Sequence, residues 1–207
     1  MSTPAGRDPE HSSPSNGPLD NDPTPAQLDP FPVVGSERIY DSRWCGLRKD
    51  RIDLGDGEIQ DHHVFEVTDA VVIVPVLPDG RLLLLWQYRH PLGHSHWELP
   101  AGRMHEGEEP ERAAERELAE ETGHRARRLE RVQGFFPING ISRHHAHVFL
   151  AHDCLELPEG TDHESSERMS VHALGPDVVR AKLFAGEIED GFALVGLFHY
   201  FARTSAG

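Results

Sequence analysis

The sequence predicts an α/β fold, in which helices cover both faces of a mixed sheet as an α/β/α sandwich, preceded by an antiparallel β extension. Three observations carry this prediction. Two near-continuous apolar runs, at 70–77 and 81–88, are typical of strands buried on both faces, which need helices on either side. The clearest helix follows them. Short β-like segments around the turn Gly55-Asp56-Gly57 precede them and indicate a small antiparallel sheet.

The elements are expected in this order. Strands of the extension occupy 38–44, 47–53 and 62–67. The turn Pro78-Asp79-Gly80 predicts a hairpin between the two apolar runs. A helix of about three turns starts at Pro110, which suits a first-turn position, and ends before Gly123, a good left-handed cap. Further strands are expected at 129–134, 145–151 and 168–174, and helices at 177–184 and 191–201, the last too apolar for a surface helix.

Composition divides the chain into three parts. The first 32 residues hold eight of the 16 prolines, mixed with Ser, Asp, Asn and Gly, and such a segment cannot offset the entropy of ordering. We therefore expect a disordered tail over 1–33, an N-terminal β region over 34–67 and the main domain over 68–203.

Charge and hydropathy exclude several classes of partner. The chain has 207 residues, with 20 Lys and Arg against 35 Asp and Glu and a net charge of −15, so it repels nucleic-acid backbones. The longest apolar stretch, 70–77, contains Pro75 and is far shorter than the roughly 20 residues of a membrane span. The N-terminus shows no signal-peptide pattern. We expect a cytoplasmic protein without membrane or nucleic-acid partners, which meets an anionic substrate through placed arginines or a metal ion.

Three acidic residues of the main helix carry the chemical signal. Glu117, Glu120 and Glu121 fall within an arc of roughly 100° on a helix, next to Ala114 and Leu118 on the face expected to be buried. A solvated surface is the ordinary interpretation of a Glu-rich helix. At the border of a core, however, carboxylates must be paired, protonated or bound to metal. Mg²⁺ or Mn²⁺ suits such oxygen ligands.

The spacing Gly102-x5-Glu108-x7-Arg116-Glu117-Leu118-x-Glu120-Glu121-x-Gly123 resembles the Nudix box. His124 stands where that box usually has an aliphatic residue. The resemblance extends to the ADP-ribose pyrophosphatase branch of the Nudix hydrolases through three further segments, although Asn139 replaces a proline common in the last of them: Gln87-Tyr88-Arg89, Trp97 to Gly102, and Phe136 to Ser142. It implies a Nudix-type sandwich, and a homodimer formed with the help of the 34–67 region.

The resemblance also implies roles for individual residues. Glu117 and Glu121 ligate the metal with the main-chain carbonyl of Ala101, and Glu120 assists. Arg116 pairs with Glu108 and orients the helix, because a planar guanidinium holds a carboxylate in two places; Gly102 and Gly123 are the structural glycines of the box. The general base is a loop glutamate, Glu164 or Glu167, of which we favour Glu167.

Two further residues are candidate substrate contacts with ordinary alternatives. Arg89 is expected to bind a phosphate or the terminal ribose, or else to form a surface ion pair. Trp97 is expected to stack on adenine, or else to anchor its strand to the core.

The function implied is metal-dependent hydrolysis, with Mg²⁺ or Mn²⁺ as cofactor, of the diphosphate bond of ADP-ribose or a related nucleoside diphosphate sugar, giving a nucleoside monophosphate and a sugar phosphate. Other substrates of the same chemistry remain open, namely FAD, NADH and GDP-mannose. A Nudix module that senses a nucleotide without cleaving it is an alternative from another class. A third is a metal-buffering protein, because the chain has 15 histidines.

Overall fold

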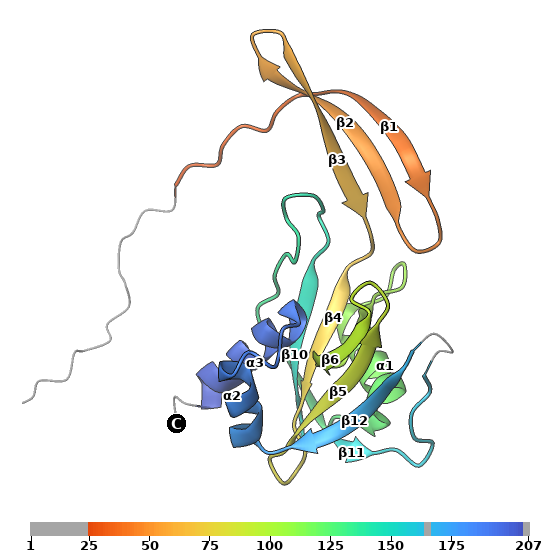
Figure 1. Cartoon of the computed structure of the whole chain (residues 1–207), viewed down its shortest axis with the longest axis vertical. Helices are drawn as coiled ribbons and strands as arrows, with labels where there is room; N and C mark the ends of the chain where they lie inside the picture. The colour runs from red at the N-terminus through yellow and green to blue at the C-terminus, as the bar shows by residue number, and fades with distance from the viewer. Residues whose placement is uncertain (1–24, 164–166, 205–207) are drawn as a thin grey trace, which may run out of the picture.

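The computed structural model describes residues 25–163 and 167–204. Its N-terminal part is an antiparallel sheet of β1 (Val33–Asp41), β2 (Gly46–Gly55) and β3 (Glu58–Glu66), in that order. Figure 1 shows this sheet projecting away from the rest of the chain. The strand β1 begins at Val33, earlier than predicted and within the expected tail. It ends before a turn in which the Ser42 amide donates to the Cys45 carbonyl at 3.0 Å. Residues 1–24 of the expected tail lie outside the described residues.

Two sheets build the main domain. The first has the order β7-β4-β10-β9 and comprises β4 (Ala70–Pro75), β7 (Ala101–Arg103), β9 (Arg128–Arg131) and β10 (Ala146–His152). Its strands β4 and β10 are parallel and the other pairs antiparallel. The second sheet is antiparallel, with the order β12-β5-β6, and comprises β5 (Leu82–Arg89), β6 (His94–Glu98) and β12 (Met169–Leu174). A short ladder joins β8 (His124–Arg125) to β11 (Leu155–Glu156).

The predicted hairpin between the two apolar runs is wrong. The turn itself forms, since Leu77 N–H donates to the Arg81 carbonyl at 2.8 Å, and one bridge joins Val76 to Leu82. Beyond that bridge β4 and β5 enter different sheets. Both edges of β4 are already paired, with β7 on one side and β10 on the other, so β5 has no edge of β4 to join.

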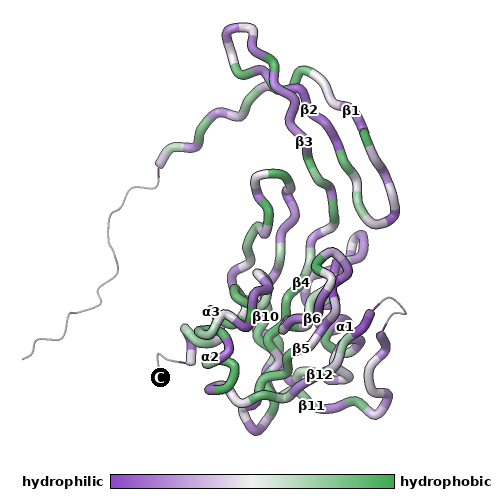
Figure 2. Tube along the Cα trace, viewed as in Figure 1, coloured by the Kyte–Doolittle hydropathy of each residue, from purple (hydrophilic) through white to green (hydrophobic). Residues whose placement is uncertain are grey.

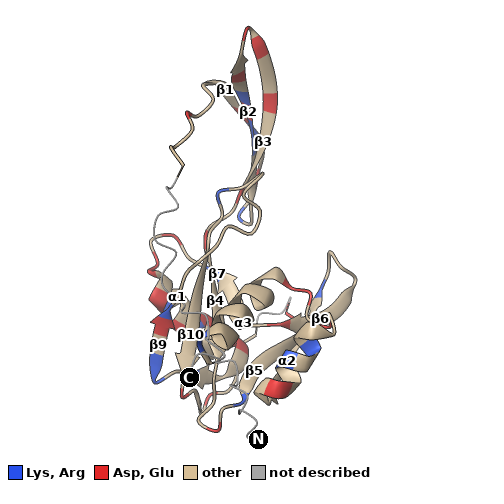
Figure 3. Cartoon of the chain, turned by 90° about the vertical axis from the view of Figure 1, so that its left-hand side faces the viewer, with Lys and Arg blue, Asp and Glu red and all other residues tan. Residues whose placement is uncertain are grey.

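The helices cover the first sheet on both faces, which confirms the α/β/α sandwich. Val71 and Ile73 of β4 pack against α1 (Pro110–Thr122), whereas Val72 and Val74 pack on the side of α3 (Gly191–Thr204), as expected of side chains that alternate along a strand. Figure 3 shows the two helices on opposite sides of β10, and the most hydrophobic segments in Figure 2 include β4 and β10. The helix α2 (Pro176–Phe184) contributes Val179 to the α3 side of the core.

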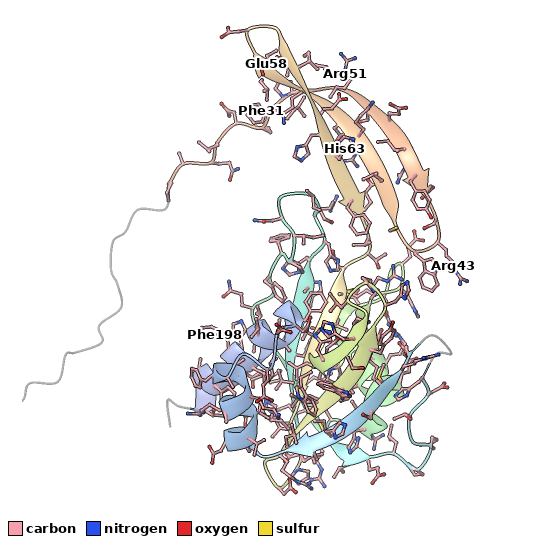
Figure 4. All side chains as sticks on the ribbon, viewed as in Figure 1. Phe31, Arg43, Arg51, Glu58, His63 and Phe198 are labelled. Atoms are coloured by element: carbon pink, nitrogen blue, oxygen red, sulfur yellow. The ribbon has the colours of Figure 1, made fainter. Side chains whose placement is uncertain are left out.

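The expectation that the last helix is not a surface helix is wrong. Ala193 and Leu197 of α3 are buried, but Leu194 is 40% and Phe198 65% exposed, and Figure 4 shows Phe198 directed away from the sheet. Its apolar content misled the prediction, because only one stripe of the helix meets the core. No helix in the described ranges is long and apolar enough to cross a bilayer.

Candidate active site

A cleft of about 1590 Å³ lies beside α1, where the loop between β1 and β2 approaches the main domain. Its walls come from segments far apart in sequence, namely residues 41–46, 66–68, 87–91, 101–106, the acidic side of α1, and residues 162, 163 and 167. Figure 4 shows Arg43 at the end of the N-terminal sheet that faces the main domain. The cleft therefore depends on both parts of the fold.

The helix α1 is built to present acids to this cleft. Pro110 occupies its first turn, and Gly123 ends it with a left-handed φ of 67°, a conformation that glycine adopts without strain. Ala114 and Leu118 are buried against the sheet. Because Glu117 and Glu121 lie one turn from them, both are drawn to the edge of the core and are only 9% and 3% exposed. Glu120 is half-buried and also lines the cleft.

Arg116 and Glu108 form the pair that the box resemblance implies. Arg116 Nε and Nη2 each donate to a Glu108 carboxylate oxygen at 3.0 Å, and the His105 amide donates to the same carboxylate at 2.9 Å. These bonds, with Arg116 the larger contributor, lower the pKa of Glu108 to about 2. The pair fastens the loop before the helix to the middle of the helix.

The same guanidinium reaches the other acids. Arg116 Nη1 donates to Glu117 Oε1 at 2.7 Å and to Glu120 Oε2 at 3.0 Å. Burial nevertheless raises the pKa of Glu117, because the contact with Arg116 does not fully offset its desolvation. Gly102 packs directly on the Glu117 carboxylate, and a Cβ at residue 102 would overlap it. A side chain at residue 102 would therefore displace the carboxylate of this acid.

Glu121 is the most deeply buried acid of the cleft. Desolvation raises its pKa well above the usual value, and the charges of Glu117 and Glu167 raise it further, while a hydrogen bond from the Ala101 amide at 2.9 Å opposes the rise. Carboxylates that raise one another's pKa in this way bind a cation favourably.

The donor set fits a hard divalent cation in chemistry. Glu117, Glu120, Glu121 and Ala101 line one cleft, and an ion that retains several waters needs few protein ligands. In the described ranges no three His, Cys, Asp or Glu residues converge as a closed ligand set. Arg116 accounts for part of this, because it occupies oxygens of Glu117 and Glu120. A tightly bound zinc needs three or four converging ligands. The histidines in those ranges form no such cluster.

The two candidate bases differ in what the structure describes. Glu167 lines the cleft, and its charge acts on both Glu117 and Glu121. Glu164 lies outside the described residues.

Of the two candidate substrate contacts, only one lines the cleft. Arg89 lines the cleft and donates from Nε and Nη2 to Glu98 at 2.7 and 2.6 Å. Glu98 is only 3% exposed, so this is not the surface ion pair considered as the alternative. Trp97 is not among the residues that line this cleft; its ring packs edge-on against Trp86 at 5.0 Å and touches the core cluster. We therefore do not retain Trp97 as a substrate contact.

Trp44, Asp162 and His163 are among the cleft residues that sequence reasoning missed. Trp44 lines the cleft and is 49% exposed. The centroid of its ring lies 4.4 Å from Cζ of Arg43 and 5.2 Å from Cζ of Arg103. The sequence could have indicated Trp44, because it is an aromatic residue next to an arginine in a polar turn. Asp162 and His163 were missed as well, because nothing in their local sequence indicates that they contact α1.

Comparisons with known proteins agree with this architecture. Residues 66–189, well over half of the chain, match the model of the NUDIX domain, and residues 32–65 match that of the nucleoside diphosphate sugar hydrolase N-terminal domain. An ADP-ribose pyrophosphatase of Bacillus subtilis is 31% identical over 139 residues, which are 67% of this chain and 75% of the relative. One of Mycobacterium tuberculosis is 31% identical over 178 residues, or 84% of this chain and 85% of the relative.

A solved structure supports the fold. The crystal structure of an ADP compounds hydrolase superposes with a TM-score of 0.77 at 18% identity, over 88% of this chain and 98% of that one. Nudix hydrolases generally use divalent metal cations. With the box, the cleft and both domain matches in agreement, the chain belongs to the Nudix hydrolase family and carries the N-terminal domain of its nucleoside diphosphate sugar hydrolases.

Proposed function

We propose that this protein hydrolyses the diphosphate bond of ADP-ribose or a related nucleoside diphosphate sugar, releasing a nucleoside monophosphate and a sugar phosphate. One observation carries the proposal: the buried Glu117 and Glu121 share a large cleft with Glu167 and Arg89. A diphosphate bridge brings negative charge, and a cleft walled by acids accepts it only together with a cation. The ADP-ribose pyrophosphatases among its relatives support this substrate class.

We assign Mg²⁺, with Mn²⁺ as a substitute, to Glu117, Glu121 and the Ala101 carbonyl, assisted by Glu120. When bound, such a cation neutralises phosphate oxygens and makes water more acidic. The other roles belong to the chain. Arg116 keeps the acids aligned through Glu108. Glu167, which lines the same cleft, accepts the proton of the attacking water while the water oxygen bonds to phosphorus and the bridging oxygen leaves.

Substrate binding is assigned to Arg89 and Trp44. Glu98 engages Nε and Nη2 of Arg89, so Nη1 has the capacity to donate to a phosphate at a fixed orientation. The half-exposed Trp44 offers an aromatic face in the same cleft, which suits the base of a nucleotide.

The experiment is a panel of substrates with and without Mg²⁺, comprising ADP-ribose, other nucleotide sugars, FAD and NADH, followed by separation of the products. Hydrolysis of ADP-ribose to AMP and ribose phosphate, only with the cation, is expected. Binding of a nucleotide without cleavage of any compound would instead identify a sensing module. Cleavage of FAD or NADH in preference to ADP-ribose would support the proposed reaction but change the assigned substrate.

We also propose a homodimer formed through the β1–β3 sheet, in a cytoplasmic protein. The outer strand β1 leaves Val33, Val34, Ile39 and Tyr40 exposed, and the sheet projects from the domain (Figure 1). Large apolar side chains exposed on an edge strand suit an interface with a second chain. Light scattering should give twice the mass of the chain, and Ile39→Glu should give a monomer. A monomeric wild-type protein would exclude the dimer.

A further inference from the structure

The C-terminal end of α1 is held by the segment that leads to Glu167. The last carbonyls of a helix have no partner within the helix. Here the Glu120 carbonyl accepts the Asp162 amide at 2.9 Å, and the Glu121 carbonyl accepts His163 Nε2 at 2.9 Å. Because a carbonyl can only accept, Nε2 of His163 carries the proton. Two neighbouring carbonyls of the acidic helix are therefore satisfied from one distant segment.

The backbone around this contact is closely packed. The Leu157 amide donates to the Gly123 carbonyl at 2.7 Å. A Cβ added to Gly123 would come within 2.9 Å of the Gly160 carbonyl carbon. Gly123 thus has two functions, since it caps α1 and lets residues 157–163 approach the helix end.

Glu167 lies between this contact and a second anchor. On its C-terminal side, the Tyr88 amide donates to the Arg168 carbonyl at 2.9 Å, where β12 joins β5. On its N-terminal side, His163 is four residues away, a span of at most roughly 14 Å for an extended chain. The proposed base is thereby tethered on its N-terminal side to the same helix that carries the proposed metal ligands.

We propose that His163 is a positioning residue, which, with the Asp162 amide, sets the placement of Glu167 against Glu117 and Glu121 by binding the Glu121 carbonyl. This inference rests on the proposed function, in which Glu167 is the base. The role assigned to His163 acts through the Glu121 carbonyl and not through a contact with substrate. Its effect should therefore fall on turnover and depend on Glu167.

The test compares His163→Ala with His163→Gln, whose amide nitrogen replaces the Nε2 donor. The matched control is His124→Ala, because His124 Nδ1 contacts the neighbouring Thr122 carbonyl at 2.7 Å but lies on β8, outside the 157–163 segment. With ADP-ribose and Mg²⁺, His163→Ala should lower kcat about tenfold and leave KM and the Mg²⁺ half-saturation within about twofold. His163→Gln and His124→Ala should stay within about threefold of wild type.

A double variant separates positioning from a general structural effect. In the Glu167→Gln background, His163→Ala should lower kcat no further. An equal loss in both backgrounds, or a tenfold rise in the Mg²⁺ half-saturation, would overturn the proposal, as would full activity of His163→Ala.

Hydrogen exchange provides a readout that needs no activity. The Asp162 amide should be protected in wild type and in His163→Gln, and should exchange faster in His163→Ala. Unchanged exchange would overturn the proposed contact. Faster exchange in a protein that cleaves nothing would refute the proposed function while leaving the contact in place.

Discussion

Replacement of Glu121 by Gln should stabilise the metal-free protein and abolish its activity. Glu121 is 3% exposed, and burial raises its pKa, so its charged form is disfavoured by the fold. Gln keeps an oxygen to accept the Ala101 amide and removes the charge. We expect a gain of about 2 kcal/mol in the free energy of unfolding at pH 8, or about 4–8 °C in Tm for a chain of this size.

The pH dependence has a definite sign. A carboxyl group whose pKa is raised by folding favours the folded state fully below its unfolded pKa, and this contribution is lost as the pH rises through the folded pKa. The advantage of Glu121→Gln over wild type should therefore vanish near pH 4.5, the ordinary value for Glu, and grow as the pH rises above it.

Magnesium should reverse the order of stability. At a concentration 100-fold above its dissociation constant, a ligand specific to the folded state adds about 2.7 kcal/mol, which we expect in wild type and not in Glu121→Gln. The kcat of the variant should fall at least ~100-fold, as the loss of about 3 kcal/mol of transition-state stabilisation requires.

The assay is thermal unfolding at pH 4.5 and 8, with EDTA and with Mg²⁺, beside steady-state hydrolysis of ADP-ribose. Glu115→Gln is the matched control, because Glu115 lies on the exposed side of the same helix and should change neither quantity. A Glu121→Gln protein that is less stable than wild type without metal, or that keeps activity within threefold, would refute the reasoning.

Three further predictions concern the neighbours of these acids. Glu108→Gln should lose about 1–2 kcal/mol of stability at pH 7. Because Arg116 lowers the pKa of Glu108 to about 2, the difference in the free energy of urea unfolding between wild type and the variant should shrink as the pH falls from about 4.5 toward 2. A difference that stays constant over this range would contradict the prediction. Gly102→Ala should displace the Glu117 carboxylate and cost at least ~10-fold in kcat with a weaker response to Mg²⁺, whereas an unchanged metal titration would count against the packing argument. Trp44→Ala should raise KM for ADP-ribose about tenfold with kcat within twofold, and an unaltered KM would remove Trp44 from the binding site.

Local patterns were sufficient for the elements that depend on nearby residues. The limits of α1 follow from Pro110 and Gly123, whose backbone preferences act within one turn. The burial of Glu117 and Glu121 follows from their position beside Ala114 and Leu118 on that helix. The apolar run of β4 was correctly interpreted as a strand covered on both faces.

Pairing between distant segments was beyond such patterns. A turn does not specify which strand edges are vacant, so β4 and β5 were wrongly joined. An apolar helix does not reveal how wide a stripe meets the core, so the exposure of Phe198 was missed. Trp44 lines the cleft beside residues far from it in the chain. The contact of His163 with α1 likewise joins residues that are distant in the sequence. The acids and their helix could thus be predicted from spacings of a few residues. The other groups that line the same cleft were set by the packing of the whole domain, because hydrogen bonds and strand pairing between remote segments leave no periodic pattern in the sequence.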